Sequence, residues 1–306
     1  MFRKLVAAIV VLGIAAAAAG WFLSAPEHLP EEVVANLRAG DAGRGELIFW
    51  AGGCASCHAP AGAKGEAKLG LGGGQRLDTP FGIFVAPNIS SDPRDGIGAW
   101  TLAEFADAML KGTSPEGKNF YPAFPYTSYA RMKPQDVSDL FAFMQSLPPV
   151  SGKAAGHELG FPFNIRRGVG LWKRLYLDSA PVVPEDQLHG DTELSILNRG
   201  RYLVEGLGHC GECHTPRNAI GGLEKTLWLA GAPAAAGEGK VPNITSGEGG
   251  ISSWSASDIA YYLESGFTPD YDSVGGEMVS VQENMAKLPA SDREAIAAYL
   301  KAVPAH

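Results

Sequence analysis

One five-residue pattern, two cysteines separated by two residues and followed by histidine, occurs twice in this chain of 306 residues. It reads CASCH at residues 54–58 and CGECH at residues 210–214. Two thiols three positions apart lie on one helical turn, so both can form thioethers with substituents of a single porphyrin. The adjacent histidine then binds the iron as its proximal ligand. The repeated pattern therefore predicts two covalently bound haem c groups, with His58 and His214 on the two irons.

The chain has four cysteines, and all of them belong to these two patterns. The alternatives are a redox-active dithiol and a zinc site assembled from two CxxC pairs. A dithiol does not require a histidine after its second cysteine, and a zinc site would have to join pairs that lie far apart in the sequence. We therefore expect haem to be attached at Cys54, Cys57, Cys210 and Cys213.

The two halves of the sequence resemble each other well beyond the cysteines. The matching pairs are the Pro-Asn-Ile segments at 87–89 and 242–244, the tryptophans Trp100 and Trp254, and apolar-periodic final helices at 135–147 and 291–303. After each tryptophan, Thr101 or Ser255 is placed to cap a helix. An internal repeat of this kind indicates tandem duplication of one haem-binding unit.

These patterns predict five segments. They are an N-terminal membrane segment at 1–24, a tether at 25–40, a first haem domain at 41–149, a connector at 150–194 and a second haem domain at 195–306. The connector is aromatic and basic, and it is too long for a plain loop. We expect it to pack across both domains and set their spacing. The alternative is a docking surface for a partner protein.

The first 24 residues predict attachment to the cytoplasmic membrane. Arg3 and Lys4 precede an uncharged run that ends with Trp21 and Phe22. A helix of that length spans about 28 Å, close to the thickness of the bilayer's hydrocarbon layer. The positive flank stays inside, so the haem domains are expected in the periplasm. A cleaved signal peptide is the alternative, because residues 15–19 offer A-x-A sites, but the aromatic extension favours an uncleaved anchor.

A low-spin haem also needs a sixth ligand, for which a methionine sulfur from a loop before the last helix is a known solution. In the second half we choose Met278, with Met285 as the second candidate. The corresponding position in the first half is Phe124, which cannot bind iron, so we choose Met132 instead. A five-coordinate first haem, or a ligand not yet identified, remains an alternative.

With these residues in place, the chain resembles the cytochrome c subunits of membrane-associated periplasmic dehydrogenases, such as the alcohol dehydrogenase cytochrome c family. The resemblance extends from about residue 41 to the C-terminus. Its most specific segments are residues 80–82, 87–89, 96–100, 121–126 and 295–301. It implies a mainly α fold, with two tandem class I cytochrome c-like domains after the membrane helix.

Two departures from that family stand out. Many of its members carry three haems where this chain has two motifs, and many have methionine where this chain has Phe124. Related sequences with phenylalanine at this position resemble the present chain in placing a methionine shortly downstream, as Met132 is placed here. The family takes electrons from a catalytic subunit, often a quinoprotein or a molybdenum protein, and passes them to quinone or a terminal oxidase.

We therefore expect an electron-transfer protein or subunit that has no catalytic residues of its own. Its donor would be a periplasmic dehydrogenase, and its acceptor an oxidase, quinone or another cytochrome. The formal net charge of −8 argues against a nucleic-acid partner. The residues expected to line the haem pockets are Pro87, Trp100, Tyr121, Pro242 and Trp254. The alternative function is a dihaem enzyme, peroxidase-like or acting on sulfur compounds, with an open or unusually ligated first haem.

Overall fold

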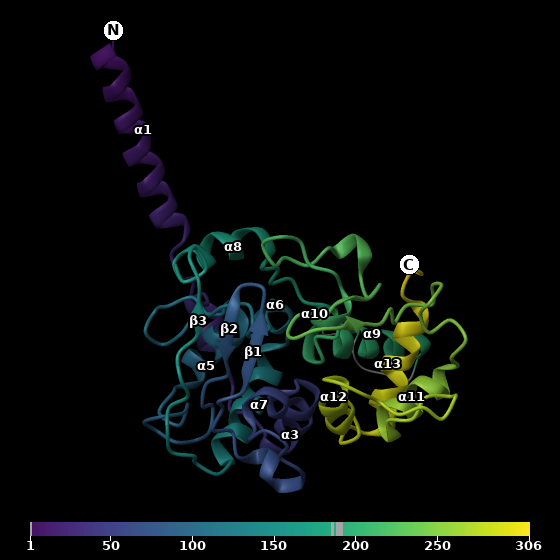
Figure 1. Cartoon of the computed structure of the whole chain (residues 1–306). Helices are drawn as coiled ribbons and strands as arrows, with labels where there is room; N and C mark the ends of the chain where they lie inside the picture. The colour runs from purple at the N-terminus through teal and green to yellow at the C-terminus, as the bar shows by residue number, and fades with distance from the viewer. Residues whose placement is uncertain (1, 185–186, 188–191) are drawn as a thin grey trace.

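The computed structural model of the chain describes residues 2–184, 187 and 192–306. The predicted connector includes the remaining internal positions, among them His189, and these lie outside the described residues. Helix α1 (Phe2–Leu23) projects from a helical body, and none of its residues is buried (Figure 1). It is long and apolar enough to cross a membrane, as expected for an anchor and equally for a signal sequence.

Each half of the body is built on a pair of crossing helices. In the first half α3 (Ala42–Ala51) packs on α7 (Pro134–Ser146), and in the second α9 (Glu193–Tyr202) packs on α13 (Ala290–Ala302). A glycine stands at both crossings. A Cβ atom on Gly45 would lie 2.0 Å from the carbonyl oxygen of Asp139, and one on Gly200 would lie 1.8 Å from that of Ala295. Each pair of helices therefore approaches so closely that no side chain fits between them.

An ion pair repeated in both halves fixes these crossings. Arg44 donates to the carboxylate of Asp139 through Nε at 2.7 Å and a second guanidinium nitrogen at 3.1 Å. Arg199 holds Asp292 in the same bidentate way, at 2.8 and 2.7 Å. Burial alone would raise the pKa of Asp139, but its hydrogen bonds with Arg44, the Asp41 amide and Gln135 lower it overall. The carboxylate therefore remains ionised at the crossing.

A further helix in each half follows the predicted tryptophans. Thr101 and Glu104 form a capping box at the start of α5 (Leu102–Lys111), and Ser255 and Asp258 form one at the start of α11 (Ala256–Ser265). Both helices end at a left-handed glycine. α5 packs on α7, and α11 packs on α13. The predicted final helices at 135–147 and 291–303 lie within one residue of α7 and α13 at each end.

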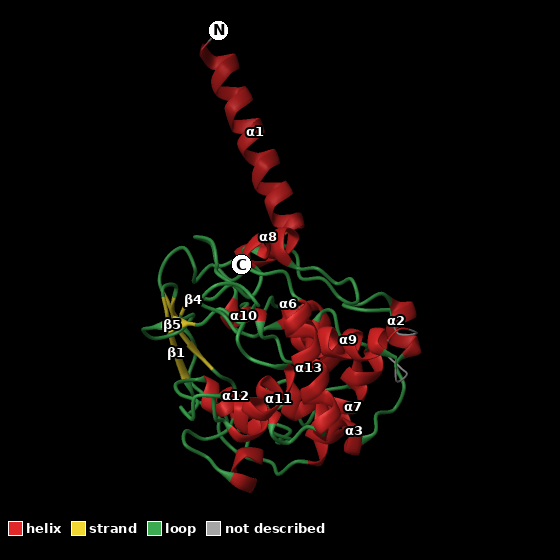
Figure 2. Ribbon diagram, turned by 90° about the vertical axis from the view of Figure 1, so that its right-hand side faces the viewer, coloured by secondary structure: helices red, strands yellow, loops and turns green. Residues whose placement is uncertain are grey.

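The other elements are short. The helices are α2 (Glu31–Asn36), α4 (Cys54–His58), η1 (Gly65–Leu69), α6 (Tyr126–Tyr129), α8 (Gly168–Tyr176), η3 (Leu203–Leu207, a π-helix), α10 (Gly211–His214), η4 (Lys225–Leu227) and α12 (Met278–Met285). The antiparallel strands β1 (Arg76–Thr79), β2 (Gly82–Val85) and β3 (Glu158–Leu159) lie in that order, and β4 (Ala232–Pro233) pairs with β5 (Lys240–Val241). Figure 2 shows helices connected by long loops, with only a few short strands, which confirms the prediction of a mainly α fold.

A single main core runs through both halves. It contains Phe49 and Val137 from the first half together with Leu203 and Ala297 from the second, all within 2% of full burial. A smaller cluster of Phe84, Tyr121 and Val169 lies outside the main core. The continuous main core means that the two halves are packed directly on each other rather than merely joined by a linker.

The connector also contacts both halves. The Nε1 of Trp172 on α8 donates to the carbonyl of Ile220 in the second half at 2.9 Å. Lys173, one residue further on, donates to the carbonyls of Lys111 and Gly112 in the first half, each at 2.7 Å. These contacts agree with the expectation that the connector sets the spacing of the halves.

Candidate haem sites

The two cysteine motifs begin with the same backbone turn. Gly53, directly before Cys54, has φ 64°, and His209, directly before Cys210, has φ 39°. A positive φ is easy for glycine and unfavourable for histidine, so His209 is held in this conformation by its surroundings. The turn redirects the chain from α3 into α4 and from η3 into α10. Each motif is thereby presented on a single helical turn, as its spacing predicts.

Both motif histidines are oriented in the same way. His58 Nδ1 lies 2.8 Å from the carbonyl oxygen of Pro87, and His214 Nδ1 lies 2.8 Å from that of Pro242. A carbonyl only accepts, so each Nδ1 carries the proton and each Nε2 keeps its lone pair. Burial lowers the pKa of both rings, although the prolyl hydrogen bond opposes this, and so favours the neutral form. Each histidine is therefore prepared to bind a metal ion through Nε2.

The two motifs lie next to each other across the boundary between the halves. Partial burial raises the pKa of the Cys57 thiol to about 11, and the nearby charges of Glu277 and Cys213 contribute. The pKa of Cys213 is likewise raised by burial, by Glu212 and by the same Glu277. The two motifs also approach each other at their entries, because a Cβ atom on Gly53 would lie 3.6 Å from His209 Nε2.

The variable residues inside each motif hold this arrangement together. Ser56 Oγ accepts from Asn284 Nδ2 at 2.9 Å, which ties the first motif to α12. Glu212 of the second motif accepts from Thr127 Oγ1 at 2.7 Å and Ser128 Oγ at 3.1 Å, which ties it to α6. Each motif is thus bonded to the opposite half through its own interior residues.

Two aromatic side chains close the boundary beside the motifs. The hydroxyl of Tyr129 donates to the carbonyl of Gly52 at 2.6 Å, and His209 Nε2 approaches the same oxygen at 3.3 Å. The two rings meet edge to face, with centroids 5.6 Å apart. Gly52 stands two residues before Cys54, so these contacts fix the entry to the first motif from the side of the second. His209 therefore forms a contact between the halves, with Nε2 directed at the carbonyl of Gly52.

The observed residues fit a covalent haem. Among the described residues no three or more His, Cys, Asp or Glu side chains converge to hold a metal ion, so the two CxxC pairs are not assembled into one zinc site. All four thiols are free. The hydroxyl of Tyr126 is buried and has no hydrogen-bond partner, which is costly unless a further group is bound nearby. Two thiols, an oriented imidazole and an unused buried donor match the requirements of a haem with acidic side groups.

Unlike the two motif histidines, the candidate methionine ligands do not occupy equivalent positions in the two halves. Met278 was expected in a loop, but it is the first residue of α12, because the two glycines before it end the loop and no glycine or proline interrupts the following turns. Its side chain is partly buried against the main core. Met132 lies in the turn between α6 and α7 and is 5% exposed. Met285 ends α12 and is 4% exposed.

The residues expected to line the haem pockets lie in different parts of the structure. Pro87 and Pro242 hold the histidines, and Trp100 and Trp254 are partly buried against the main core. Tyr121 belongs instead to the smaller cluster, where its hydroxyl donates to the carbonyl of Phe163 at 2.9 Å. Its ring therefore lies beside β2 and the connector, apart from the residues that surround the motifs.

Sequence reasoning missed the side chains that join the halves, namely Ser56, Tyr129, His209, Glu212 and Asn284. The first motif and the second differ at their interior positions, and this difference was the available signal. It could not be interpreted without knowing that each motif faces the other half.

Comparison with known proteins identifies the family of this chain. The family model described as Cytochrome c matches residues 42–148. A "Diheme cytochrome c-type" protein of Cereibacter sphaeroides is 54% identical over 310 residues, covering 100% of this chain and 99% of that protein.

Cytochrome subunits of dehydrogenases are also similar. The fructose dehydrogenase cytochrome subunit of Gluconobacter japonicus is 38% identical over 86% of this chain, which spans 52% of that subunit. The alcohol dehydrogenase (quinone) cytochrome c subunit of Gluconobacter oxydans is 34% identical over 94% of this chain, which spans 60% of it. With its paired CxxCH motifs and prolyl-bonded histidines, the chain belongs to the c-type cytochromes, electron-transfer proteins with covalently bound haem c, and within them to the dihaem proteins related to dehydrogenase cytochrome subunits.

Proposed function

We propose that this protein is a membrane-anchored dihaem cytochrome c that carries electrons from a periplasmic dehydrogenase towards the respiratory chain. Two dehydrogenase cytochrome subunits with 34% and 38% identity support the donor. The chain spans only 60% and 52% of those subunits, so the partner is part of the proposal. The exposed apolar helix α1 supports the anchor, with the body held on the periplasmic side.

Two haem groups would be held by this chain's own residues. Cys54 and Cys57 fix one haem, and Cys210 and Cys213 the other. When bound, each haem cycles between ferric and ferrous iron and so carries one electron. Pro87 and Pro242 keep the two imidazoles in one tautomer and one orientation, which limits the rearrangement that accompanies each change of charge.

The observation that carries the proposal is the position of the two motifs against each other. Ser56 and Glu212 bind the motifs to opposite halves, and His209, directly before the second motif, lies 3.3 Å from the carbonyl oxygen of Gly52, just before the first. Haems attached there would be held at a fixed separation by the shared core. Such an arrangement suits a protein that receives an electron on one haem and delivers it from the other.

We further propose Met278 and Met132 as sixth ligands. The helix that begins at Met278 lies beside the first motif, because Asn284 on the same helix donates to Ser56 at 2.9 Å, and the charge of Glu277 raises the pKa of both Cys57 and Cys213. A neutral thioether favours the ferrous state, and axial ligands span about 0.8 V in haem potential. Met278→Ala is therefore expected to lower the potential of one haem and change its spectrum while sparing the other.

Redox titration followed in the visible region measures this effect. Met285→Leu is the matched control, because it keeps the apolar volume of a buried methionine on the same helix. If Met285→Leu shifts the potential and Met278→Ala does not, the assignment of Met278 is wrong. Redox titration and visible spectroscopy of Met132→Ala test the proposed ligand of the first half in the same way.

Purification from native membranes tests the donor and the anchor together. The tagged full-length protein is extracted in detergent, and its stoichiometric partners and its own intact mass are determined by mass spectrometry. A periplasmic dehydrogenase at one to one and an N-terminus that retains residues 2–23 are expected. Recovery with oxidase subunits alone, or with no partner, contradicts the dehydrogenase assignment. Loss of the first residues from the mature chain contradicts the anchor.

A further inference from the structure

Helix α8 buries a charged side chain and exposes apolar ones, which is the opposite of what is usual for a helix at a surface in contact with water. The residue Lys173 is only 7% exposed, and its Nζ donates to Asn119 Oδ1 at 2.8 Å as well as to two backbone carbonyls. Leu171 and Leu175, one turn apart, are 42% and 71% exposed. Burying a leucine side chain stabilises a fold by about 1.5–3 kcal/mol. Helix α8 lacks that stabilisation from its two leucines, although it buries Lys173 with three hydrogen-bond acceptors.

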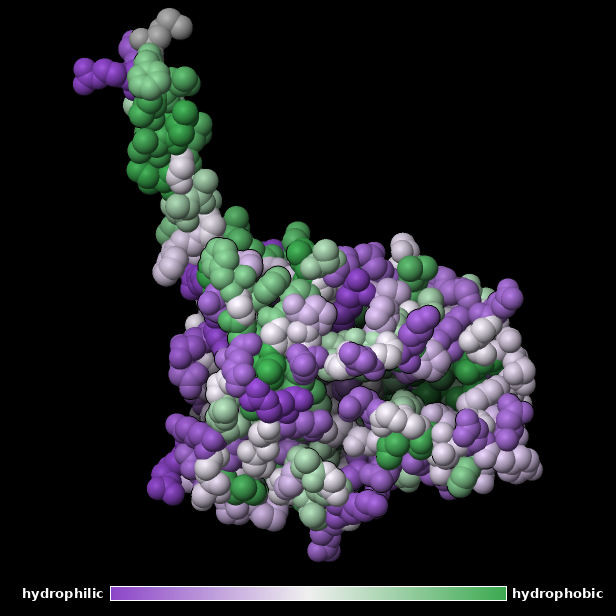
Figure 3. Space-filling view, viewed as in Figure 1, coloured by the Kyte–Doolittle hydropathy of each residue, from purple (hydrophilic) through white to green (hydrophobic). Residues whose placement is uncertain are grey.

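The apolar surface continues on both sides of α8. In the loop before the helix, Phe161 is 81% exposed and Ile165 is 52% exposed. On the other side, Ile220 is 51% exposed, and its carbonyl is held by Trp172 of α8. Figure 3 shows hydrophobic side chains gathered on the top of the body, beside the foot of α1. A group of exposed apolar side chains on one face marks an interaction surface.

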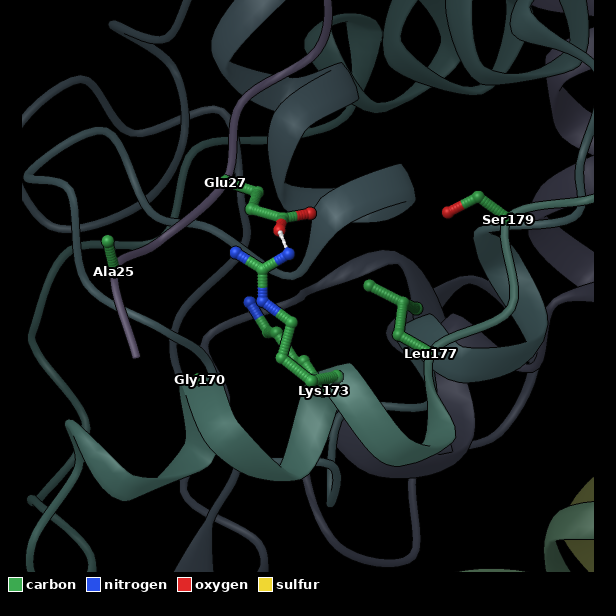
Figure 4. A pocket seen from close by; sticks show the side chains of 7 residues that line it. Ala25, Glu27, Gly170, Lys173, Leu177 and Ser179 are labelled. Carbon is green, nitrogen blue, oxygen red and sulfur yellow. Dashed lines mark ion pairs between the residues drawn. The ribbon is translucent and has the colours of Figure 1, made fainter. Parts of the chain in front are cut away.

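α8 is tied to the end of the membrane segment by several contacts. A Cβ atom on Gly170 would lie 2.1 Å from the carbonyl oxygen of Ser24, so the two backbones touch. Arg167 donates to the carbonyl of Trp21 at 2.7 Å, and its guanidinium lies 4.3 Å from the centre of the indole. Figure 4 shows the neighbouring pocket, where Ala25 and Glu27 of the tether lie opposite Gly170 and Lys173 of α8. Glu27 pairs there with Arg174 of α8 at 2.6 Å.

These contacts set the height of α8 relative to a bilayer. The 22 residues of α1 form a rod of about 33 Å, which matches a hydrocarbon layer about 30 Å thick. Its last turn, with Trp21 and Phe22, then lies at the level of the lipid headgroups, where tryptophan is favoured. Because α8 contacts residues 21–24 directly, it lies at that level as well.

We propose that α8 and the loop at 161–165 form a second membrane contact, which lies in the headgroup layer of the phospholipid bilayer. Leu171, Leu175 and Phe161 face the acyl chains, while Arg167 and Arg174 remain bonded to residues 21–27 and hold the helix at the headgroup level. This inference rests on the proposed function in one respect, that α1 remains in the mature protein as its anchor. The contact holds the haem-bearing body at a fixed height and tilt, which a single flexible tether cannot do.

Site-directed nitroxide labelling of the full-length haem protein tests this inference. In the haem-loaded protein the four native cysteines would be held as thioethers, so a cysteine introduced by Leu171→Cys or Leu175→Cys would carry the only reactive thiol. Leu47→Cys is the matched control, because Leu47 is 39% exposed against 42% for Leu171 and lies on α3, at the opposite end of the body in Figure 1. The proteins are reconstituted into vesicles of phosphatidylethanolamine and phosphatidylglycerol.

The measured quantity is the broadening of each label's spectrum by a water-soluble nickel chelate and by oxygen, which concentrates in the bilayer. Loss of nickel broadening and gain of oxygen broadening on reconstitution are expected at 171 and 175 and not at 47. Unchanged nickel access at 171 and 175, in protein that floats with the vesicles, overturns the membrane contact and leaves the anchor intact. Failure of the protein to float contradicts the anchor itself and the inference with it. Retention of both haems in each variant, checked by absorbance, confirms that the labelled proteins are folded.

Discussion

Replacing both Cys210 and Cys213 with alanine is expected to leave the protein with one covalent haem instead of two. The histidine of the second motif would remain, but nothing would attach the porphyrin to that half. Since the haem would be part of the core in each half, the variant should also unfold more readily than the parent protein. Intact mass under denaturing conditions measures the loss directly, because only covalently attached haem survives. The corresponding replacement of Cys54 and Cys57 should remove the other haem.

Ser56→Ala provides the control for this prediction. It changes an interior position of the first motif and removes the hydrogen bond from Asn284 while keeping both thiols and His58. The mass should therefore still correspond to two attached haems. If the double variant at 210 and 213 retained two covalent haems, the assignment of the second motif would be wrong. A loss of haem in Ser56→Ala would mean that attachment depends on contact between the halves and not on the thiols alone.

Gly45→Ala is expected to destabilise the protein more than any surface substitution. The added methyl group would stand 2.0 Å from the carbonyl oxygen of Asp139 and 2.8 Å from the Cβ of Phe143, so α3 and α7 would have to move apart. Overpacking of this kind typically costs about 1–3 kcal/mol, and a clash with backbone atoms is expected at the upper end of that range. The separation would also strain the bidentate pair between Arg44 and Asp139. Chemical denaturation of the haem-loaded protein, followed by circular dichroism, gives the change in the free energy of unfolding.

Gly43→Ala tests whether the effect belongs to the crossing or to the helix. Gly43 is exposed on the same helix, and an added Cβ would meet only the flexible carboxylate of Asp41, at 3.3 Å. Alanine is favoured over glycine inside a helix by about 1 kcal/mol, so this variant should be unchanged or slightly more stable. Equal destabilisation by both substitutions would contradict the close approach of α3 and α7 at Gly45.

Several features of the haem sites could be predicted because their chemistry is local. The thiols and the histidine of each motif lie within five consecutive residues, so one helical turn is sufficient to place them. The capping boxes at Thr101 and Ser255 are equally local and form as predicted. The final helices could be predicted from the apolar periodicity within each segment. The internal repeat meant that a feature recognised in one half could be expected in the other.

The positions of the methionines and the pocket residues were harder to predict from the sequence, because they depend on how distant chain segments pack around the motifs. Met278 was expected in a loop and begins a helix, since helix formation there depends on packing against the main core as well as on the preceding glycines. Tyr121 matched a family segment, but it packs beside Phe84 in the smaller cluster. Such placements depend on contacts between residues distant in sequence, which no local pattern contains.

The sequence by itself determined the chemistry of this protein: two thioether-forming motifs, two proximal histidines, a repeated helical unit and an apolar N-terminal helix. Only the tertiary structure decided that the first motif meets the second half through Ser56 and Asn284, and that α8 buries Lys173 while it exposes Leu175. The physical reason is the range of the interactions. Attachment and capping act over a few residues of one chain segment, whereas the meeting of two surfaces depends on the packing of the whole core.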